Sequence, residues 1–493
     1  MTREQNTPET QGGAPNSRRP GTICVDLDGT LVRTDTLLEG LVRLLHSPRS
    51  WVGLLGASLR GRATLKRQVA DRVALDVERL PYERTLIEYL RAEREHGRRL
   101  VLATAADQRV ADAVCEYLNL FDEVIASDGV NNVKGLAKSK VLVKRFGLRE
   151  FTYVGNSWTD FEVWRDAGGA VLVNAPRGLA EKVAGITPIE RRIDDRPSSV
   201  RNLIRVLRPY QWLKNVLVFL PLITANALRD WGAWVESVLM FWAFCATASA
   251  VYIINDIMDL KADRAHPRKR GRPFASGDLP LVAAPIAAPA LLLAGILFGL
   301  AADSVRVIVV YAACSFVYSM KIKELPLVDV FALALLYTLR VVGGAEASDY
   351  QLSPWLLAFS IFLFLGLAVM KRVSELVDLS RRETRTAPRR GYDTDDMLVL
   401  RTMGVSASFM SATVLALFVQ SDSVIQRYAN PQLLWAVVPL LLFWQCRLWL
   451  STARGYMHDD PIVYAARDWV SWVTGGTVLV AFVLARGLDS RVG

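Results

Sequence analysis

Polar and apolar positions divide the chain into two halves. Up to about residue 205, charged residues recur every few positions, as in a soluble protein. Beyond that point we count about nine apolar segments, several at or slightly below the length of roughly 20 residues that spans a bilayer. They lie near 212–228, 233–254, 281–301, 305–320, 327–343, 354–370, 405–420, 432–450 and 469–485. This pattern predicts a soluble domain followed by a polytopic membrane domain.

Composition along the chain suggests four parts. Residues 1–20 are polar, contain Pro and Gly and carry no signal-peptide pattern, so we expect a disordered tail. Residues 21–185 form the soluble domain and 206–493 the membrane domain. Between them, residues 186–205 are polar and predict a linker.

The net charge of +10 is explained by membrane topology better than by nucleic acid. Lys and Arg cluster in the loops 257–280 and 371–392, whereas the loop 344–354 has none. Under the positive-inside rule both basic loops face the cytoplasm, which places the N-terminal domain on that side of the cytoplasmic membrane. The five cysteines are scattered, with no CxxC, and indicate neither a disulfide framework nor a zinc site.

The stretch "TICVDLDGTLVRTD" carries the first candidate chemistry. An apolar run, Thr22–Val25, predicts a buried strand that delivers Asp26 and Asp28 to its carboxyl end. Open α/β sheets place their chemistry at this edge. Further along come Thr104 in "LVLATAA", two lysines in "NNVKGLAKSK", and "VGNSWTD".

In this order the motifs resemble the haloacid dehalogenase (HAD) superfamily, over roughly residues 20–185. The resemblance implies an α/β Rossmann-like fold with a small helical cap and phosphatase chemistry. Asp26 would be the nucleophile and Asp28 the general acid and base. Thr104 and Lys138, which we favour over Lys134, would hold the phosphoryl oxygens. The implied Mg²⁺ ligands are Asp26, Asp28, Asn156 and Asp160. Asn156 departs from the aspartate usual in the family, which implies weaker metal affinity.

The stretch "NDIMDLKADRAHPRKRGRP" at the end of the second apolar segment carries the second candidate site. Asp256, Asp259 and Asp263 recur at spacings of three and four, which would place them on one helix face. Carboxylate oxygens hold hard divalent cations. The bases that follow fit a metal that arrives with phosphate, because cations and Mg²⁺ together neutralise a diphosphate.

This motif and the number of spans resemble the UbiA superfamily of intramembrane prenyltransferases, whose fold is all-helical. Further stretches over about 200–485 ("RPYQWLKNVLVFLPL", "YTLRVVGG", "MKRVSELVDL") resemble its decaprenyl-phosphate phosphoribosyltransferase branch. The branch implies transfer from phosphoribosyl diphosphate (PRPP) to a polyprenyl phosphate. Asn255, Asp256 and Asp259 would hold Mg²⁺, with Asp256 and Asp259 counted as catalytic. The implied substrate-binding residues are Lys214, Asn215, Asp263, His266, Lys269, Arg272, Lys321, Lys323, Asp329, Lys371 and Arg372.

The combined hypothesis is a bifunctional membrane enzyme in which the phosphatase half removes the 5-phosphate of the transferase product. The lipid-linked pentose would then serve cell wall polysaccharide synthesis. The alternative is a UbiA-type prenyltransferase acting on an aromatic acceptor such as 4-hydroxybenzoate, with the HAD half regulatory or acting elsewhere. Two local assignments stay open. Arg208, Gln211, Lys214 and Asn215 either bind the lipid phosphate or anchor the interface, and Asp460 is either a ligand or a helix cap. No nucleic acid partner is expected, and a homo-oligomer is left open.

Overall fold

The computed structural model describes residues 20–44, 62–128, 132–196, 199–225, 227, 229–381, 391–457 and 460–486. The predicted tail, except Pro20, and residues 382–390 of the second basic loop lie outside these ranges. The chain divides into two compact units, Met1–Asn202 with Ile257–Val282, and Leu203–Asp256 with Ala283–Gly493. We call them the α/β unit and the helical unit.

A parallel six-stranded sheet forms the centre of the α/β unit, in the order β3-β2-β1-β4-β5-β6. Its strands are β1 (Thr22–Val25), β2 (Arg99–Asp107), β3 (Glu123–Ser127), β4 (Phe151–Gly155), β5 (Gly169–Val173) and β6 (Ile189–Ile193). Strands β1, β4 and β5 are buried on both faces, apart from the half-buried Thr22, as expected when helices cover both sides of a parallel sheet. The winding direction reverses between β1 and β4, so their carboxyl ends form the crevice where such sheets bind ligands.

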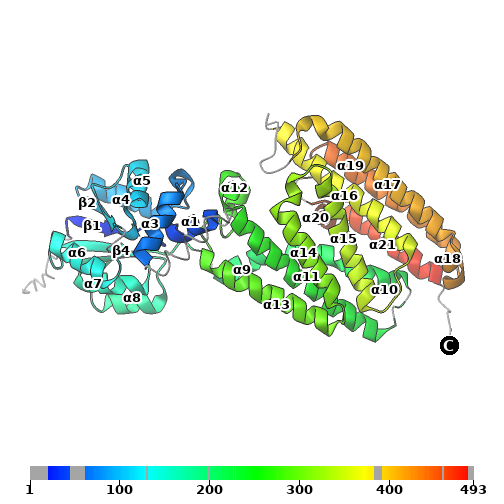
Figure 1. Cartoon of the computed structure of the whole chain (residues 1–493), viewed down its shortest axis with the longest axis horizontal. Helices are drawn as coiled ribbons and strands as arrows, with labels where there is room; N and C mark the ends of the chain where they lie inside the picture. The colour runs from blue at the N-terminus through cyan, green and yellow to red at the C-terminus, as the bar shows by residue number, and fades with distance from the viewer. Residues whose placement is uncertain are drawn as a thin grey trace, which may run out of the picture. The chain divides into compact units, whose positions relative to one another are not determined.

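Helices cover both faces of the sheet (Figure 1). The two sets of helices bury separate apolar clusters. α4 (Arg84–Glu95) and α5 (Gln108–Leu118) pack on the face of Ile23 and Val25. α6 (Leu136–Phe146), α7 (Phe161–Asp166) and α8 (Arg177–Ala184) pack on the face of Cys24. α1 (Thr36–Leu44) and α3 (Arg62–Arg72) lie between β1 and β2 in sequence, where the small cap is predicted.

Strand β6 lies inside the segment predicted as a linker. It pairs in parallel with β5, and Ile193 is buried against the core. Arg191 and Arg192 interrupt its apolar pattern, which is why the segment reads as polar in the sequence. The sheet therefore extends to residue 193 rather than ending near 185.

Residues 257–282 belong to the α/β unit, although they follow the second apolar segment in sequence. They include α12 (Leu260–Ala265) and a short 3-10 turn, η5 (Lys269–Gly271). Arg264 Nη1 donates to Glu39 Oε2 over 2.8 Å, and both side chains are buried. Arg33 Nη1 contacts Asp278 Oδ1 at 3.2 Å. These ion pairs join the segment to the loop and helix that follow β1.

Among its described residues, the helical unit contains seven helices that are long and apolar enough to cross a membrane, by length and composition. These ranges are Trp231–Met258, Leu281–Ala301, Val328–Ala347, Pro354–Ser380, Thr394–Val419, Pro431–Ala453 and Trp469–Arg486. Four of them coincide with α11 (Trp231–Met258), α15 (Val328–Ala347), α16 (Pro354–Ser380) and α21 (Trp469–Arg486). The other three begin in a 3-10 turn that leads into α13 (Ala284–Ala301), α17 (Met397–Val419) and α19 (Val437–Ala453). Shorter helices are α9 (Ser199–Leu207), α10 (Leu220–Thr224), α14 (Val305–Met320), α18 (Asp422–Arg427) and α20 (Pro461–Arg467).

Two of the nine predicted segments differ from this set within the described residues. The first, near 212–228, forms a 3-10 helix η4 (Pro209–Phe219) and the short α10, which begins next to Pro221. Proline cannot donate to a helix ladder, so one continuous span is not formed there. α14 is apolar but only 16 residues long.

Helix α15 packs closely against η4, and Gly344 makes that approach feasible. A Cβ at Gly344 would lie 1.9 Å from the carbonyl oxygen of Val218. The contact brings the polar side chains of η4 next to those of α15.

We expect Gly344→Ala to lower stability, because the added methyl group forces α15 away from η4. Overpacking of this kind costs about 1–3 kcal/mol. The check is thermal unfolding of the full chain in detergent micelles. Gly475→Ala in α21 is the matched control, since a Cβ there meets nothing within 4 Å. Equal unfolding temperatures for the two variants would contradict the expectation.

Candidate active sites

At the carboxyl edge of the sheet, Asp26 follows β1 and lies in a buried hydrogen-bond chain. Lys138 Nζ, from α6, donates to Asp26 Oδ1 and to the Tyr153 hydroxyl, each over 2.8 Å. The Tyr153 hydroxyl donates in turn to Asp160 Oδ1 over 2.9 Å. The chain therefore fixes a cation against Asp26 and connects the ends of β1 and β4.

The loop after β4 is held by the second oxygen of Asp160. Asp160 Oδ2 accepts hydrogen bonds from the Asn156 and Ser157 amides over 3.2 and 3.0 Å, and from Ser157 Oγ over 2.8 Å. A Cβ at Gly29 (φ +78°) would lie 2.4 Å from Asn156 Nδ2. Glycine at this position thus lets the loop after β1 approach the Asn156 side chain closely.

Asp28 lies in a different environment from Asp26. Thr36 N donates to Asp28 Oδ1 over 2.8 Å. Burial and the nearby Asp35 together raise the pKa of Asp28 to about 7, against the hydrogen bond from Thr36 N, which lowers it. Burial also raises the pKa of Asp26, to about 6, against the opposing effect of Lys138. A carboxyl group with a pKa near 7 can hold and release a proton at neutral pH.

Thr104 is fully buried in β2, next to β1, and its Oγ1 accepts from Ala106 N over 3.0 Å. In the pairing of β1 with β2, Val25 lies opposite Leu102. Two residues beyond this pair, Leu27 and Thr104 therefore reach the same level of the sheet. Thr104 is thus at the same sheet edge as Asp26 and Asp28.

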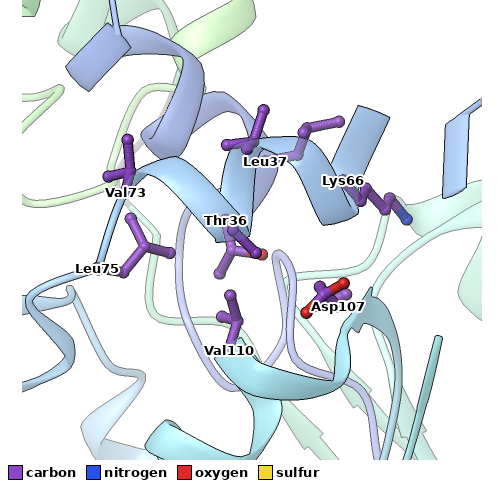
Figure 2. Close-up of a pocket in the computed structure, with 10 residues that line it drawn as sticks. Thr36, Leu37, Lys66, Val73, Leu75, Asp107 and Val110 are labelled. Carbon is purple, nitrogen blue, oxygen red and sulfur yellow. The ribbon is translucent and has the colours of Figure 1, made fainter. Parts of the chain in front are cut away.

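A small pocket adjoins this edge, between α1, α3 and the start of α5 (Figure 2). Its lining residues are Thr36, Leu37, Lys66, Val69, Ala70, Val73, Leu75, Ala106, Asp107 and Val110. Lys66 Nζ donates to the carbonyl of Ala105 over 2.5 Å. The sequence alone did not single out Lys66, because α3 shows no motif and its approach to β2 is tertiary. The pocket is a candidate for the leaving group of a phosphoryl substrate.

The acidic motif of the second predicted site begins in the last turn of α11. Asp256 forms an ion pair with Arg208, and both side chains are largely buried. Asn255 Oδ1 is buried and meets no hydrogen-bond donor among the described residues. An oxygen left in this state fits a ligand that supplies positive charge, such as a metal ion.

Asp259 interrupts the single helix face that the spacing predicts. α11 ends at Met258, Asp259 is the N-cap residue of α12, and α12 begins at Leu260. Aspartate competes with the backbone for hydrogen bonds, which favours helix ends over interiors. Asp263 follows in α12 and accepts from Arg272 Nη1 over 2.6 Å. The one-face prediction is therefore wrong beyond Met258.

A buried basic cluster lies inside the helical unit. Lys214 Nζ, from η4, donates to Asp460 Oδ2 over 2.7 Å, and the Tyr337 hydroxyl of α15 donates to the same oxygen over 2.9 Å. Lys371 Nζ, from α16, is 3.8 Å from that oxygen. Burial raises the pKa of Asp460, but Lys214 and Lys371 outweigh it and hold the pKa at about 2.

Arg340 extends this cluster and was missed as a site residue, although "YTLRVVGG" was recognised as a motif. Its Nε donates to Asn215 Oδ1 over 2.7 Å and its Nη2 to the Tyr311 hydroxyl over 2.9 Å. Asp460 accepts from Ile462 N through Oδ1, so it is both a cap of α20 and a partner of the lysines. We define the buried basic cluster as Lys214, Asn215, Tyr337, Arg340, Lys371 and Asp460.

Arg372 and Asp329 form a separate buried network. Arg372 Nε pairs with Asp329, its Nη1 donates to Glu375 and its Nη2 to the Tyr318 hydroxyl, the last two over 2.6 Å. The Tyr392 hydroxyl donates to the other oxygen of Asp329 over 2.5 Å. All three guanidinium nitrogens already have protein partners, so the network favours a supporting role over direct phosphate contact.

The remaining predicted substrate ligands belong to both units. Lys321 is largely exposed near Glu324, and Lys323 is buried in η7 (Ile322–Glu324). His266 Nδ1 accepts from the amides of Arg268 and Lys269 at the start of η5. Within the described ranges, no three His, Cys, Asp or Glu side chains converge as a metal-binding group.

Comparison with known proteins shows what the helical half is. Residues 216–460 match the model of the UbiA prenyltransferase family. The membrane half is a UbiA-family domain. It makes the chain an integral membrane protein, in which the parallel sheet of the α/β unit precedes the UbiA domain in sequence.

Several relatives align with most or part of this sequence. The uncharacterized protein y4nM of Sinorhizobium fredii is 36% identical over 470 residues, covering 94% of this chain and 90% of that protein. The nodulation protein NoeC of Azorhizobium caulinodans is 35% identical, covering 57% of this chain and 90% of its own. Decaprenyl-phosphate phosphoribosyltransferase of Corynebacterium glutamicum is 37% identical over 218 residues, which is 42% of this chain and 65% of that enzyme.

Solved structures show a looser likeness. A UbiA homolog from Archaeoglobus fulgidus bound to GPP and Mg²⁺ aligns with 57% of this chain and 99% of its own, at 15% identity and a TM-score of 0.43. Apo phosphoserine phosphatase aligns with 36% of this chain and 94% of its own, at 20% identity and a TM-score of 0.27. At these scores the likeness carries no argument about activity.

Proposed function

We propose that this protein is a bifunctional enzyme that makes a lipid-linked ribose in two steps. The UbiA domain transfers phosphoribose from PRPP to a polyprenyl phosphate, and the HAD-like domain removes the 5-phosphate of the product. The observation that supports the proposal is one chain that combines a buried Asp26–Lys138 pair at the carboxyl edge of a parallel sheet with a helical half similar to decaprenyl-phosphate phosphoribosyltransferases. Both sites would work on the cytoplasmic face of the membrane.

In the transfer step a phosphate oxygen of the polyprenyl phosphate forms a bond to C1 of the ribose. The bond from C1 to the diphosphate breaks, and diphosphate leaves with the electron pair. The protein contributes position and charge rather than covalent chemistry. The buried basic cluster supports this reaction, because both substrates are polyanions. Asp329 is engaged by Arg372, which argues against a second free carboxylate cluster of the kind that grips a prenyl diphosphate.

Mg²⁺ fits the oxygen donors of both sites. In the UbiA domain the buried Asn255 Oδ1 has no donor among the described residues, and Asp256 supplies a carboxylate. Asp259 would complete the set. In the HAD-like domain Asp26, Asp28 and Asn156 would supply carboxylate, backbone and amide oxygens. Asp160, whose two oxygens accept from Tyr153 and from the loop after β4, would act mainly by holding that loop. The metal would neutralise charge on the diphosphate in one site and on the transferred phosphoryl group in the other.

In the second step Asp26 attacks phosphorus of the 5-phosphate, and the bond to the ribose oxygen breaks. Asp28 donates a proton to that oxygen as it leaves, which its raised pKa allows. Lys138 holds the nucleophile, and Thr104 lies at the same edge for the phosphoryl oxygens. Water then hydrolyses the aspartyl phosphate, with Asp28 taking up a proton, and inorganic phosphate is released.

The deciding experiment incubates the full chain in membranes with labelled PRPP and a polyprenyl phosphate, followed by lipid extraction. Label in the lipid fraction is the expected result. A parallel assay supplies a prenyl diphosphate and 4-hydroxybenzoate. Consumption of this second pair with no use of PRPP would overturn the proposal in favour of the prenyltransferase.

Asn156→Asp should strengthen Mg²⁺ binding in the HAD-like domain, because a carboxylate replaces an amide oxygen. We expect the Mg²⁺ concentration for half-maximal phosphate release to fall about tenfold, the scale of one added charge beside a metal. Asn119→Asp, on the exposed end of α5, is the control that adds the same charge elsewhere. An unchanged or higher Mg²⁺ requirement would remove Asn156 from the metal ligands.

A further inference from the structure

Arg264 belongs in sequence to the stretch that follows the acidic motif, but in the structure it serves the α/β unit. It lies in α12 beside Asp263, among the bases whose place in the sequence suggested contact with phosphate. Its Nη1 and Nη2 instead donate to the two carboxylate oxygens of Glu39, the first over 2.8 Å. Its Nε donates to the carbonyl of Ala275 over 3.0 Å. All three guanidinium nitrogens are thus engaged by protein acceptors, which leaves Arg264 poorly placed to hold a substrate phosphate.

The ion pair between Arg264 and Glu39 is internal to the α/β unit. The side chain of Glu39 is 1% exposed and that of Arg264 is 6% exposed. A planar guanidinium that meets a carboxylate through two parallel hydrogen bonds fixes orientation as well as charge. A buried carboxylate that loses such a partner keeps its desolvation penalty without compensation. Glu39 therefore depends on Arg264 for its position, although 225 residues separate the two in sequence.

Two further hydrogen bonds connect Glu39 to the turn that carries Asp28. The buried Thr34 Oγ1 donates to Glu39 Oε1 over 2.9 Å, and the Thr34 carbonyl accepts from Gly29 N over 3.1 Å. Thr36 N, two residues further on, donates to Asp28 Oδ1 over 2.8 Å. The side chain of Glu39 therefore anchors the same turn that fixes the orientation of the Asp28 carboxylate.

The segment 257–282 makes a second contact with this turn, at Arg33. A Cβ at Gly277 (φ +74°) would lie 2.5 Å from Arg33 Cβ and 3.1 Å from the Arg33 carbonyl oxygen, so glycine permits the approach. Asp278 Oδ1 pairs with Arg33 Nη1 at 3.2 Å. The segment thus supports the turn after Asp28 from two of its own parts.

We propose that Arg264 is a positioning residue of the phosphatase: through Glu39 and Thr34 it holds the turn from which Asp28 protonates the leaving oxygen. The inference rests on the phosphatase step of the proposed function. It goes beyond that step, because it makes phosphate removal depend on a residue inside the range 216–460 that matches the UbiA family. A phosphatase half cut off before the helical unit would lack this support for its general acid.

Two phosphate monoesters separate the placement of the general acid from the integrity of the fold. Ribose 5-phosphate expels the oxygen of a primary alcohol, which needs a proton from Asp28 as it leaves. The ester p-nitrophenyl phosphate expels a phenolate stabilised by its nitro group, which leaves without a proton. The value of kcat/KM reports the steps up to release of the alcohol, so a displaced Asp28 lowers it much more for the first ester than for the second. Both esters are assayed with the full chain in detergent micelles.

Arg264→Lys keeps a positive charge beside Glu39 but loses the paired hydrogen bonds. We expect its kcat/KM for ribose 5-phosphate to fall at least about tenfold more than that for p-nitrophenyl phosphate, since a general acid contributes about 10²–10⁴-fold and misplacement forfeits part of this. Thr34→Val, which removes the hydroxyl from the same path, should shift the ratio in the same direction. Arg98→Lys is the matched control, because the buried Arg98 pairs with Glu190 at 2.7 Å but precedes the amino end of β2.

Equal losses for the two esters, or a ratio no different from that of Arg98→Lys, would overturn the inference and leave Arg264 as a structural ion pair. If Arg264→Lys does not fold, the ratio in Thr34→Val decides. A wild-type chain that does not hydrolyse ribose 5-phosphate would also overturn it, because there would be no step to support. The proposed function is judged separately, by label from PRPP in lipid. A shifted ratio without such label upholds Arg264 and refutes the transferase step, whereas label with an unchanged ratio does the reverse.

Discussion

Asp26→Asn should leave the lipid product with its 5-phosphate attached, because the variant lacks the nucleophile of the second step. Asparagine preserves the size of the side chain and keeps an oxygen for Lys138, which lies 2.8 Å from Asp26 Oδ1. Loss of a covalent nucleophile commonly costs a thousandfold or far more, so we expect at least about a thousandfold less phosphate release. The transferase step should continue, since none of its predicted residues is Asp26.

Thin-layer separation of extracted lipids from wild type and Asp26→Asn provides the measurement. Asp28→Asn should give a similar pattern, because the ribose oxygen then leaves without a proton donor. Asp112→Asn, on the exposed face of α5, is a control that removes a carboxylate from the same domain. Identical lipid patterns from wild type and Asp26→Asn would show that the HAD-like domain serves a different substrate or none.

The candidate site of the α/β half was predictable from the sequence, because its side chains come directly after the apolar runs that form strands. Apolar runs that end in Asp26 and in the loop of Asn156 indicate parallel strands, and the observed sheet confirms the α/β prediction. The hydrogen-bond chain through Tyr153 was not predictable, since Tyr153 reads as an ordinary strand residue. Lys66 was missed for a similar reason, because only the packing of α3 brings it to the pocket.

The helical half shows a different limit of sequence reasoning. Hydropathy predicted its membrane character, and the family match confirms it. It did not predict that Pro209 and Pro221 accompany a 3-10 segment instead of a first span. Nor did it join Lys214 to Asp460, which are 246 residues apart in sequence. An ion pair between residues so far apart in sequence depends on how the helices pack, and a local sequence pattern contains no information about that packing.

Asp256→Asn should lower phosphoribosyl transfer at least about a hundredfold, the scale of losing one key electrostatic stabiliser of a transition state. The residue keeps its shape but loses the charge proposed to hold Mg²⁺ beside Asn255. The measurement is transfer of label from PRPP into lipid across a Mg²⁺ titration. Asp468→Asn, which removes the partner of Arg447 in the same domain, is the matched control.

The ion pair between Asp256 and Arg208 offers a second explanation for such a loss, because Asp256→Asn leaves a largely buried guanidinium without its carboxylate. The double variant Asp256→Asn with Arg208→Gln separates the two, since it removes both charges. If Asp256 mainly balances Arg208, the double variant should regain stability and transfer together. If Asp256 holds the metal, thermal stability should recover while transfer stays low and needs more Mg²⁺. Near-normal transfer in a well-folded Asp256→Asn protein would remove Asp256 from the site altogether.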